Sequence, residues 1–302
     1  FKEVNIFTDI GMINTTNQKM QNDNNALWSR IVNNRRVIYS IEYLKHYFDH
    51  FKPGFLFIRG DGNPKFSTQD VGQLYLWELP FFIAGSLFLF RQRIGFWWIL
   101  PLWMIIGIIP AATARETPHA LRIETTLPTF QIITAIGITV FLSKILNFKY
   151  FKFLIVIFIF SLLFFNFSYY VHGYYTHYPR EYSGEWQYGY EESIDFVKKI
   201  RNNYDEIHIT TELGRPYMYY LFYLKYDPRQ YRKIAVIDRD VFGFVHVNSF
   251  DKYFFFKDLV KVENKNKKIL YIDVASKIRD NIKVVKEFRL LNKSKVLVAY
   301  EM

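Results

Sequence analysis

The chain has 302 residues and a formal net charge of +11, and half of its residues are hydrophobic. The excess positive charge is spread as +2 over residues 1–72, +4 over 73–171 and +5 over 172–302. No segment therefore has the concentrated basic charge that is typical of a nucleic-acid-binding protein. The sequence contains no cysteine, which excludes a disulfide framework, a thiolate metal site and a cysteine nucleophile.

Residues 1–72 are polar, and they begin with neither a charged nor an apolar leader segment. Helical spacing of apolar residues predicts helices at 26–32 and 40–51, and a strand-like run follows at 55–58. We interpret residues 1–72 as an extracytoplasmic loop segment between membrane helices. This interpretation predicts further transmembrane helices upstream of Phe1.

Four apolar stretches follow, at 74–90, 94–112, 127–142 and 153–171. A helix needs about 20 apolar residues to cross a bilayer and about 17 can suffice. The expected fold is therefore a membrane α-helical bundle of four transmembrane helices over 73–171, embedded in a lipid bilayer.

Basic residues in the links between these stretches predict the orientation. Arg91 and Arg93 lie in the first link, and Lys144, Lys149 and Lys152 lie in the third, with no acidic residue in either. By the positive-inside rule these links are cytoplasmic. We therefore expect a multi-pass protein of the plasma membrane, with residues 1–72 and 172–302 extracytoplasmic.

Residues 172–302 alternate predicted helices with predicted strands, which favours a small extracytoplasmic α/β domain with a mixed sheet. The predicted helices are 191–201 and 215–226. The predicted strands are 206–211, 233–237, 269–274, 284–290 and 296–300. An aromatic section poor in helix signals lies at 242–256.

The link at 113–126 carries Arg115, His119 and Arg122 between two apolar stretches. Guanidinium groups bind phosphate well, because the planar fork donates two hydrogen bonds and keeps its charge. A lipid-linked phosphate would meet such a loop at headgroup depth. The alternative is that both arginines pair with Glu116 and Glu124 and serve only solubility and topology.

Three other residues are candidates for substrate contact. Glu78 lies one turn inside the first apolar stretch, where a carboxylate is costly unless it is paired or reaches the interface. Asp61 and Lys65 lie in a Gly-Asp-Gly-Asn-Pro turn and could touch a sugar or a metal, although such turns favour these residues for backbone reasons alone. The histidines show no metal-ligand spacing. Nothing in the sequence indicates a cofactor, and a divalent metal stays open.

Four sequence stretches together resemble the GT-C superfamily of membrane glycosyltransferases, in particular the bacterial protein-mannosyltransferase-like and aminoarabinose-transferase-like group. They are YLKHYFDHFKPGFLFIRGD (43–61), GQLYLWELP (72–80), TPHALR (117–122) and YSGEWQYGY (182–190). The resemblance covers only the C-terminal part of such a protein. It implies that Arg122, followed by Leu127 and Pro128, contacts the phosphate of the lipid carrier, with Arg115 and His119 as neighbours.

The resemblance also implies the activity, which is transfer of a sugar from a polyprenyl-phosphate donor to a protein or glycan/lipid acceptor. In that family the catalytic acid lies in the first outer loop, so the catalytic residue is expected upstream of Phe1 and this chain alone is expected to be inactive. The alternative is a non-enzymatic membrane-anchored protein whose outer α/β domain binds a partner. Four helices with polar groups near their outer ends favour the enzyme.

Overall fold

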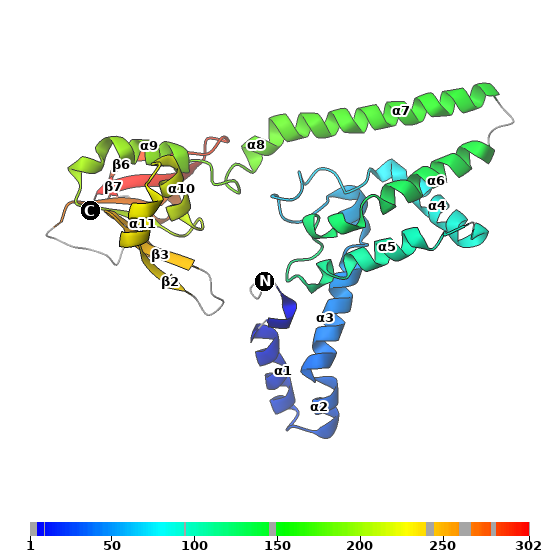
Figure 1. Cartoon of the computed structure of the whole chain (residues 1–302), viewed down its shortest axis with the longest axis horizontal. Coiled ribbons are helices and arrows are strands. Elements are labelled where there is room, and N and C mark those ends of the chain that lie inside the picture. The colour runs from blue at the N-terminus through cyan, green and yellow to red at the C-terminus, as the bar shows by residue number, and fades with distance from the viewer. Residues whose placement is uncertain are drawn as a thin grey trace. The chain divides into compact units, whose positions relative to one another are not determined.

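The computed structural model describes residues 5–8, 10–93, 95–144, 149–239, 245–259, 267–278 and 282–301. The chain divides into two compact units, Phe1–Tyr175 and Thr176–Met302. The N-terminal unit is helical and the C-terminal unit is built around a sheet (Figure 1).

The N-terminal unit begins with α1 (Ile10–Asn22), α2 (Leu27–Val32) and α3 (Arg35–Asp49), and α1 lies beside α3 (Figure 1). Helix α3 starts where the Asn34 side chain accepts a hydrogen bond from the backbone N–H of Arg36, which caps its first turn. The strand predicted at 55–58 is wrong. Residues Gly54–Ile58 form a π-helical turn, and its three central side chains are buried in the core of this unit.

The prediction of a bundle of four transmembrane helices is also wrong. The four apolar stretches form α4 (Leu79–Gln92), α5 (Ile99–Ile108), α6 (Thr129–Lys144) and α7 (Lys149–His172). At 1.5 Å per residue the first three are only about 21, 15 and 24 Å long, against a hydrocarbon layer of about 30 Å. Among the described residues only one helix is long and apolar enough to cross a membrane.

Proline and glycine explain why the helices are shorter than the apolar stretches. Pro80 lies in the first turn of α4, so the residues before it form a separate 3₁₀ turn. Gly95 has a positive φ of 57° in the link before α5. Pro110 follows α5, and Pro128 precedes α6. Counting apolar residues along the sequence missed these interruptions.

Helices α4 and α6 pack closely because glycines face each other across their contact. A Cβ atom on Gly85 would overlap the carbonyl oxygen of Ile133, and one on Gly137 would overlap that of Phe81. Small residues allow two helix backbones to approach in this way.

The segment that can span a membrane is Phe153–Glu181, which contains most of α7 and has a mean hydropathy of 2.2 in its most apolar window. None of that window is buried inside the protein. A core helix of a soluble protein passes the same test of length and composition, but it would be mostly buried. The exposure of α7 therefore favours contact with lipid.

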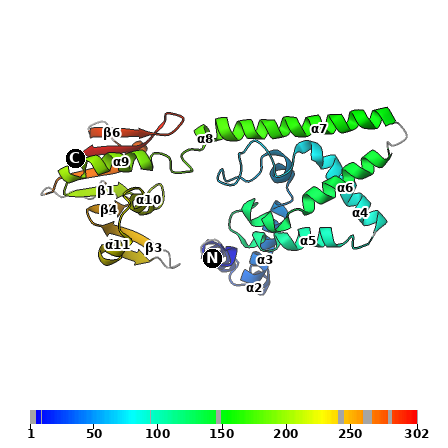
Figure 2. The ribbon, with the colours of Figure 1, turned by 45° about the horizontal axis from the view of Figure 1, so that its top comes forward.

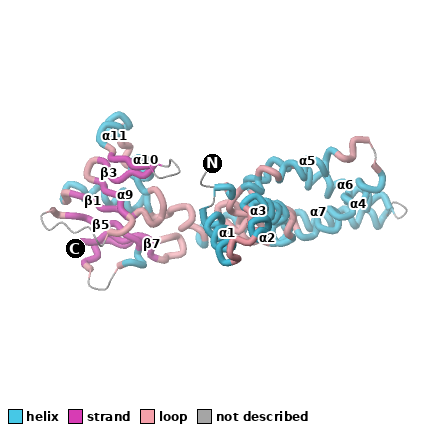
Figure 3. The backbone as a smooth tube through the Cα atoms, turned by 90° about the horizontal axis from the view of Figure 1, so that it is seen from below, coloured by secondary structure: helices cyan, strands magenta, loops and turns pink. Residues whose placement is uncertain are grey.

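The C-terminal unit contains one seven-stranded mixed sheet of order β2-β3-β4-β1-β5-β7-β6, and Figure 3 shows its strands in magenta. The three central strands, β4, β1 and β5, are parallel, and the outer pairs are antiparallel. The strands are β1 (Glu206–Thr210), β2 (Val236–Arg239), β3 (Val245–Phe250), β4 (Tyr253–Phe256), β5 (Ile269–Val274), β6 (Lys283–Arg289) and β7 (Lys295–Glu301).

Helices α9 (Tyr190–Ile200) and α10 (Pro216–Tyr223) cover one face of this sheet (Figure 2). Ile194 and Val197 of α9 and Tyr220 of α10 are buried against inward-facing residues of β1, such as Ile207 and Ile209. The short helices α8 (Tyr178–Glu181) and α11 (Pro228–Ile234) complete the unit. The strand predicted at 233–237 begins only at Val236, because α11 takes up the residues before it.

Candidate functional site

The loop between α5 and α6 is held by three side chains from an earlier part of the chain. The Thr117 hydroxyl donates to Asp49 Oδ2 at 2.9 Å, the His119 N–H donates to His50 Nε2 at 3.2 Å, and the Ala120 N–H donates to Asp61 Oδ2 at 2.7 Å. We call Asp49, His50 and Asp61 the loop clamp. All three side chains are buried, and the bond between the His119 N–H and His50 is buried as well, whereas the other two are partly buried.

The hydrogen bonds of His50 determine its protonation. Its Nδ1 lies 2.8 Å from the carbonyl oxygen of His46, which can only accept, so Nδ1 carries the proton. Nε2 is then free of a proton and accepts from the His119 N–H. Burial lowers the pKa of His50 below its ordinary value of 6.5, because the charged ring would be desolvated. His50 therefore holds the loop as a neutral acceptor.

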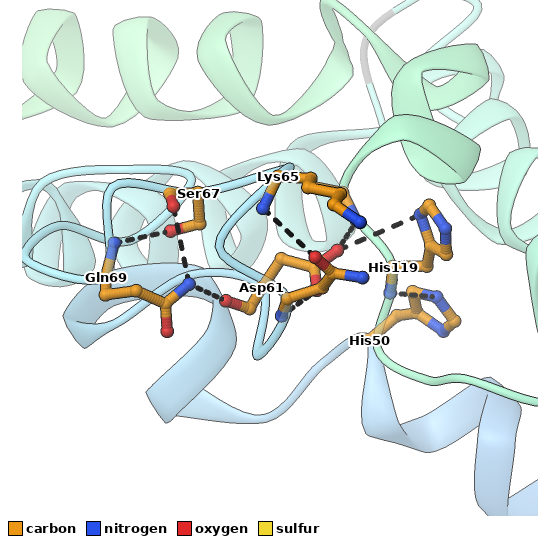
Figure 4. A network of polar contacts seen from close by, with 8 residues as sticks. His50, Asp61, Lys65, Ser67, Gln69 and His119 are labelled. Carbon is orange, nitrogen blue, oxygen red and sulfur yellow. Dashed lines mark hydrogen bonds and ion pairs between the residues drawn. The ribbon is translucent and has the colours of Figure 1, made fainter. Parts of the chain in front are cut away.

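Asp61 joins its own turn to the loop (Figure 4). Its Oδ1 accepts from the Asn63 N–H at 2.8 Å, and its backbone carbonyl accepts from Gln69 Nε2 at 2.6 Å. With the bond to Ala120, both carboxylate oxygens are engaged by backbone N–H groups. Asp61 thus organises two backbone segments rather than facing an open site.

His119 lies beside Asp61 and under an aromatic ring. Its Nδ1 is 3.8 Å from Asp61 Oδ2, beyond hydrogen-bonding distance, and the Phe66 ring centroid lies 4.5 Å from that of the imidazole. Burial lowers the pKa of His119, and the positive charge of Arg122 lowers it further, against an opposing effect of Asp61. The ring is therefore mostly neutral at pH 7.

The two arginines of the loop differ in their surroundings. Arg115 is half-buried, and its Nε donates to the backbone carbonyl of Asn5 at 3.2 Å. Arg122 is half-exposed on the 3₁₀ helix Leu121–Thr126. Within the described part of the chain, no hydrogen bond or ion pair engages its guanidinium, and neither Glu116 nor Glu124 pairs with either arginine. The alternative in which the glutamates neutralise the arginines is therefore not what the structure contains.

An apolar groove of about 610 Å³ lies next to the same 3₁₀ helix. It is lined mainly by side chains of α5 and its flanks, among them Trp98, Leu102 and Trp103, and Thr125 closes one side. Trp103 Nε1 donates to the Thr125 carbonyl at 2.7 Å, which fixes this wall. In a 3₁₀ helix, residues three apart lie one above the other. Arg122 therefore extends from the same side of the helix as Thr125.

The other predicted site residues have structural partners. Glu78 Oε2 accepts from the Tyr75 N–H at 2.9 Å, so the carboxylate caps the turn before α4. Lys65 is exposed, and its side chain turns toward the Asp61 carboxylate (Figure 4). The described residues contain no cluster of histidine and acidic side chains that could hold a metal ion.

Asp49, His50 and Phe66 were missed as site residues by sequence reasoning. The first two lie within the stretch 43–61 that carries the family resemblance, and this was the only signal for them. Comparison of the chain with protein-family models, curated proteins and solved structures gives no match.

Proposed function

We propose that the chain is part of a membrane glycosyltransferase that takes a sugar from a polyprenyl-phosphate donor and transfers it to an extracytoplasmic protein, glycan or lipid acceptor. The observation that supports this proposal best is Arg122. It is a half-exposed cation on a clamped loop, without a carboxylate partner in the described residues, and next to an apolar groove. A lipid phosphate needs this combination of a cation and an apolar surface.

In the proposed reaction, an acceptor oxygen or nitrogen attacks the anomeric carbon, and the bond from that carbon to the phosphate oxygen breaks. Negative charge then builds up on the departing polyprenyl phosphate, which Arg122 would stabilise with its guanidinium fork. His119 lies in the same loop and is available as a neutral donor or acceptor. No acidic residue of this chain is assigned as the general base, because the two acids of the loop clamp, Asp49 and Asp61, already accept hydrogen bonds from the loop.

The apolar groove would accept the first isoprene units of the carrier. Its lining is almost wholly hydrocarbon and aromatic, and about 610 Å³ exceeds what a headgroup alone would fill. Arg122 lies one turn before Thr125, the residue of this helix that lines the groove.

The test is donor binding by the full-length protein, with Arg122→Gln as the variant and Arg91→Gln as the matched control. Arg91 is also exposed, lies in the last turn of α4 and does not line the groove. Loss of a charge-assisted hydrogen bond of about 1.5–3 kcal/mol should weaken binding of polyprenyl phosphate by about tenfold or more. Equal affinities of Arg122→Gln and Arg91→Gln would remove the phosphate role.

The proposal requires the loop and the C-terminal unit on the same, extracytoplasmic side of the plasma membrane. It therefore requires α6 to cross the membrane together with α7, although α6 is only about 24 Å long. Lys149 and Lys152 begin the α7 segment, which fits a cytoplasmic start of this span. These 302 residues contain no cysteine, so in a full-length background without cysteine, single substitutions at the exposed residues Glu116 and Asn202 give unique labelling sites. We expect both Glu116→Cys and Asn202→Cys to react with an impermeant maleimide on intact cells. Labelling of either one only after permeabilisation would contradict this orientation.

A further inference from the structure

A second pocket, of about 280 Å³, lies in the C-terminal unit, remote in sequence from the loop clamp. It opens where two parallel strands end: Thr211 directly follows β1, and Lys257 directly follows β4. The Thr211 N–H donates to the Phe256 carbonyl at 2.9 Å, which ties these two strand ends together. In open α/β sheets, ligands bind in crevices outside the carboxyl ends of parallel strands.

The described lining of this pocket is basic and polar. It contains Arg215, His246 and Lys257, and among the described residues that line it there is no aspartate or glutamate. The nearby acid Glu212 is directed elsewhere, since its Oε1 pairs with Lys277 Nζ at 2.7 Å. Thr211, Tyr217 and Asn248 add hydrogen-bonding groups to the wall. Such a cavity favours an anion.

The backbone of the turn between β1 and α10 adds to this preference. Gly214 has a φ of 118°, which a residue with a side chain rarely adopts, and its N–H donates to the Thr211 carbonyl. The turn leads into α10, whose first residues Pro216 and Tyr217 line the pocket and whose N-cap residue Arg215 makes no side-chain cap. The partial positive charge of this helix end therefore lies on the pocket side.

We propose that this pocket binds the phosphate group of a small phosphorylated ligand, with Arg215 and Lys257 as its charged contacts. A volume of about 280 Å³ is near the lower limit of known ligand sites, so the ligand is no larger than a sugar phosphate or a single phosphorylated headgroup. The site does not depend on the glycosyltransferase proposal, because it lies in a different unit and uses different residues.

The test is calorimetric titration of glucose 1-phosphate into the full-length protein in phosphatidylcholine nanodiscs. The background is Arg122→Gln, so that any phosphate binding at the loop is removed. We expect saturable binding that inorganic phosphate displaces. Lys257→Gln and Arg215→Gln should each weaken it about tenfold or more, whereas Lys257→Arg should keep most of the affinity. Lys198→Gln is the matched control, since Lys198 is exposed on α9 and does not line the pocket.

A second arm identifies the source of the phosphate. Nanodiscs that contain phosphatidic acid should weaken glucose 1-phosphate binding if the natural ligand is a lipid headgroup, and should leave it unchanged if the ligand is soluble. The proposal is overturned if the Arg122→Gln protein does not bind glucose 1-phosphate, or if Lys257→Gln and Arg215→Gln bind it as tightly as Lys198→Gln. Failure of donor binding at Arg122 alone would leave this result untouched, so the two proposals fail separately.

Discussion

Replacement of Asp61 tests whether the loop clamp holds the Arg122 loop in place. In Asp61→Ala, the Ala120 and Asn63 N–H groups both lose a carboxylate acceptor, at 2.7 and 2.8 Å, at a residue that is only 4% exposed. A hydrogen bond to a charged group contributes about 1.5–3 kcal/mol, so the two together should contribute about 3–6 kcal/mol to holding the loop in place. Asp61→Asn keeps one carbonyl acceptor and should lose about half of this free energy.

The assay is hydrogen exchange at the Ala120 amide, followed by donor affinity of the same variants. We expect exchange at Ala120 to rise by two or more orders of magnitude in Asp61→Ala, since each 1.4 kcal/mol corresponds to about a factor of ten. The control is Asp70→Ala, because Asp70 is an exposed acid in the segment that follows the same turn. If Asp61→Ala and Asp70→Ala exchange equally at Ala120, the clamp does not hold the loop and the reasoning is refuted.

Three further predictions concern the same unit. Burial lowers the pKa values of His50 and His119 below 6.5, so the loop should be fully stable above about pH 6.5 and should lose stability as the pH falls from there toward the folded-state pKa values. Thermal unfolding at pH 7.5 and 5 measures this loss, and a His50→Gln variant should depend less on pH. Gly137→Ala should destabilise the α4–α6 contact by about 1–3 kcal/mol in thermal unfolding, whereas Gly54→Ala, which meets nothing within 4 Å, should not. Glu78→Ala should lower the free energy of unfolding by about 0.5–2 kcal/mol, because the Tyr75 N–H loses its acceptor. Glu116→Ala, at an exposed glutamate, should not change it measurably.

The sheet could be predicted from sequence because its strands are encoded locally. The predicted strand at 269–274 coincides with β5, whose six residues are all buried, and β6 and β7 lie within one residue of the predicted ranges. Strands β3 and β4 were not separated in the aromatic section 242–256, because the turn between them is only two residues long. A two-residue break is a weak signal within a run of aromatic residues.

The membrane bundle was predicted wrongly for a different reason. Hydropathy measures how much apolar sequence is available, whereas the length of a helix depends on where its backbone is interrupted. The stretch 94–112 contains no charged residue, yet α5 covers only ten of its residues. The loop clamp could not be predicted from the sequence either. Asp49 and His50 are separated from their partners by 68 and 69 residues, and no spacing rule links residues so far apart.

The two acids of the clamp have partners other than Arg122, and Asp49 Oδ1 pairs with Lys52 Nζ at 2.7 Å. Had Asp61 pointed a free carboxylate at Arg122, the two would neutralise each other and an incoming phosphate would have to displace the carboxylate. Instead both Asp61 oxygens accept backbone N–H groups, and His50 holds the loop without any charge. The Asp61 carboxylate is thus engaged by backbone N–H groups, and no described carboxylate pairs with the Arg122 guanidinium. A neutral His50 is essential to this arrangement, since a protonated ring could not accept the His119 N–H and would add a second, competing positive charge inside the clamp.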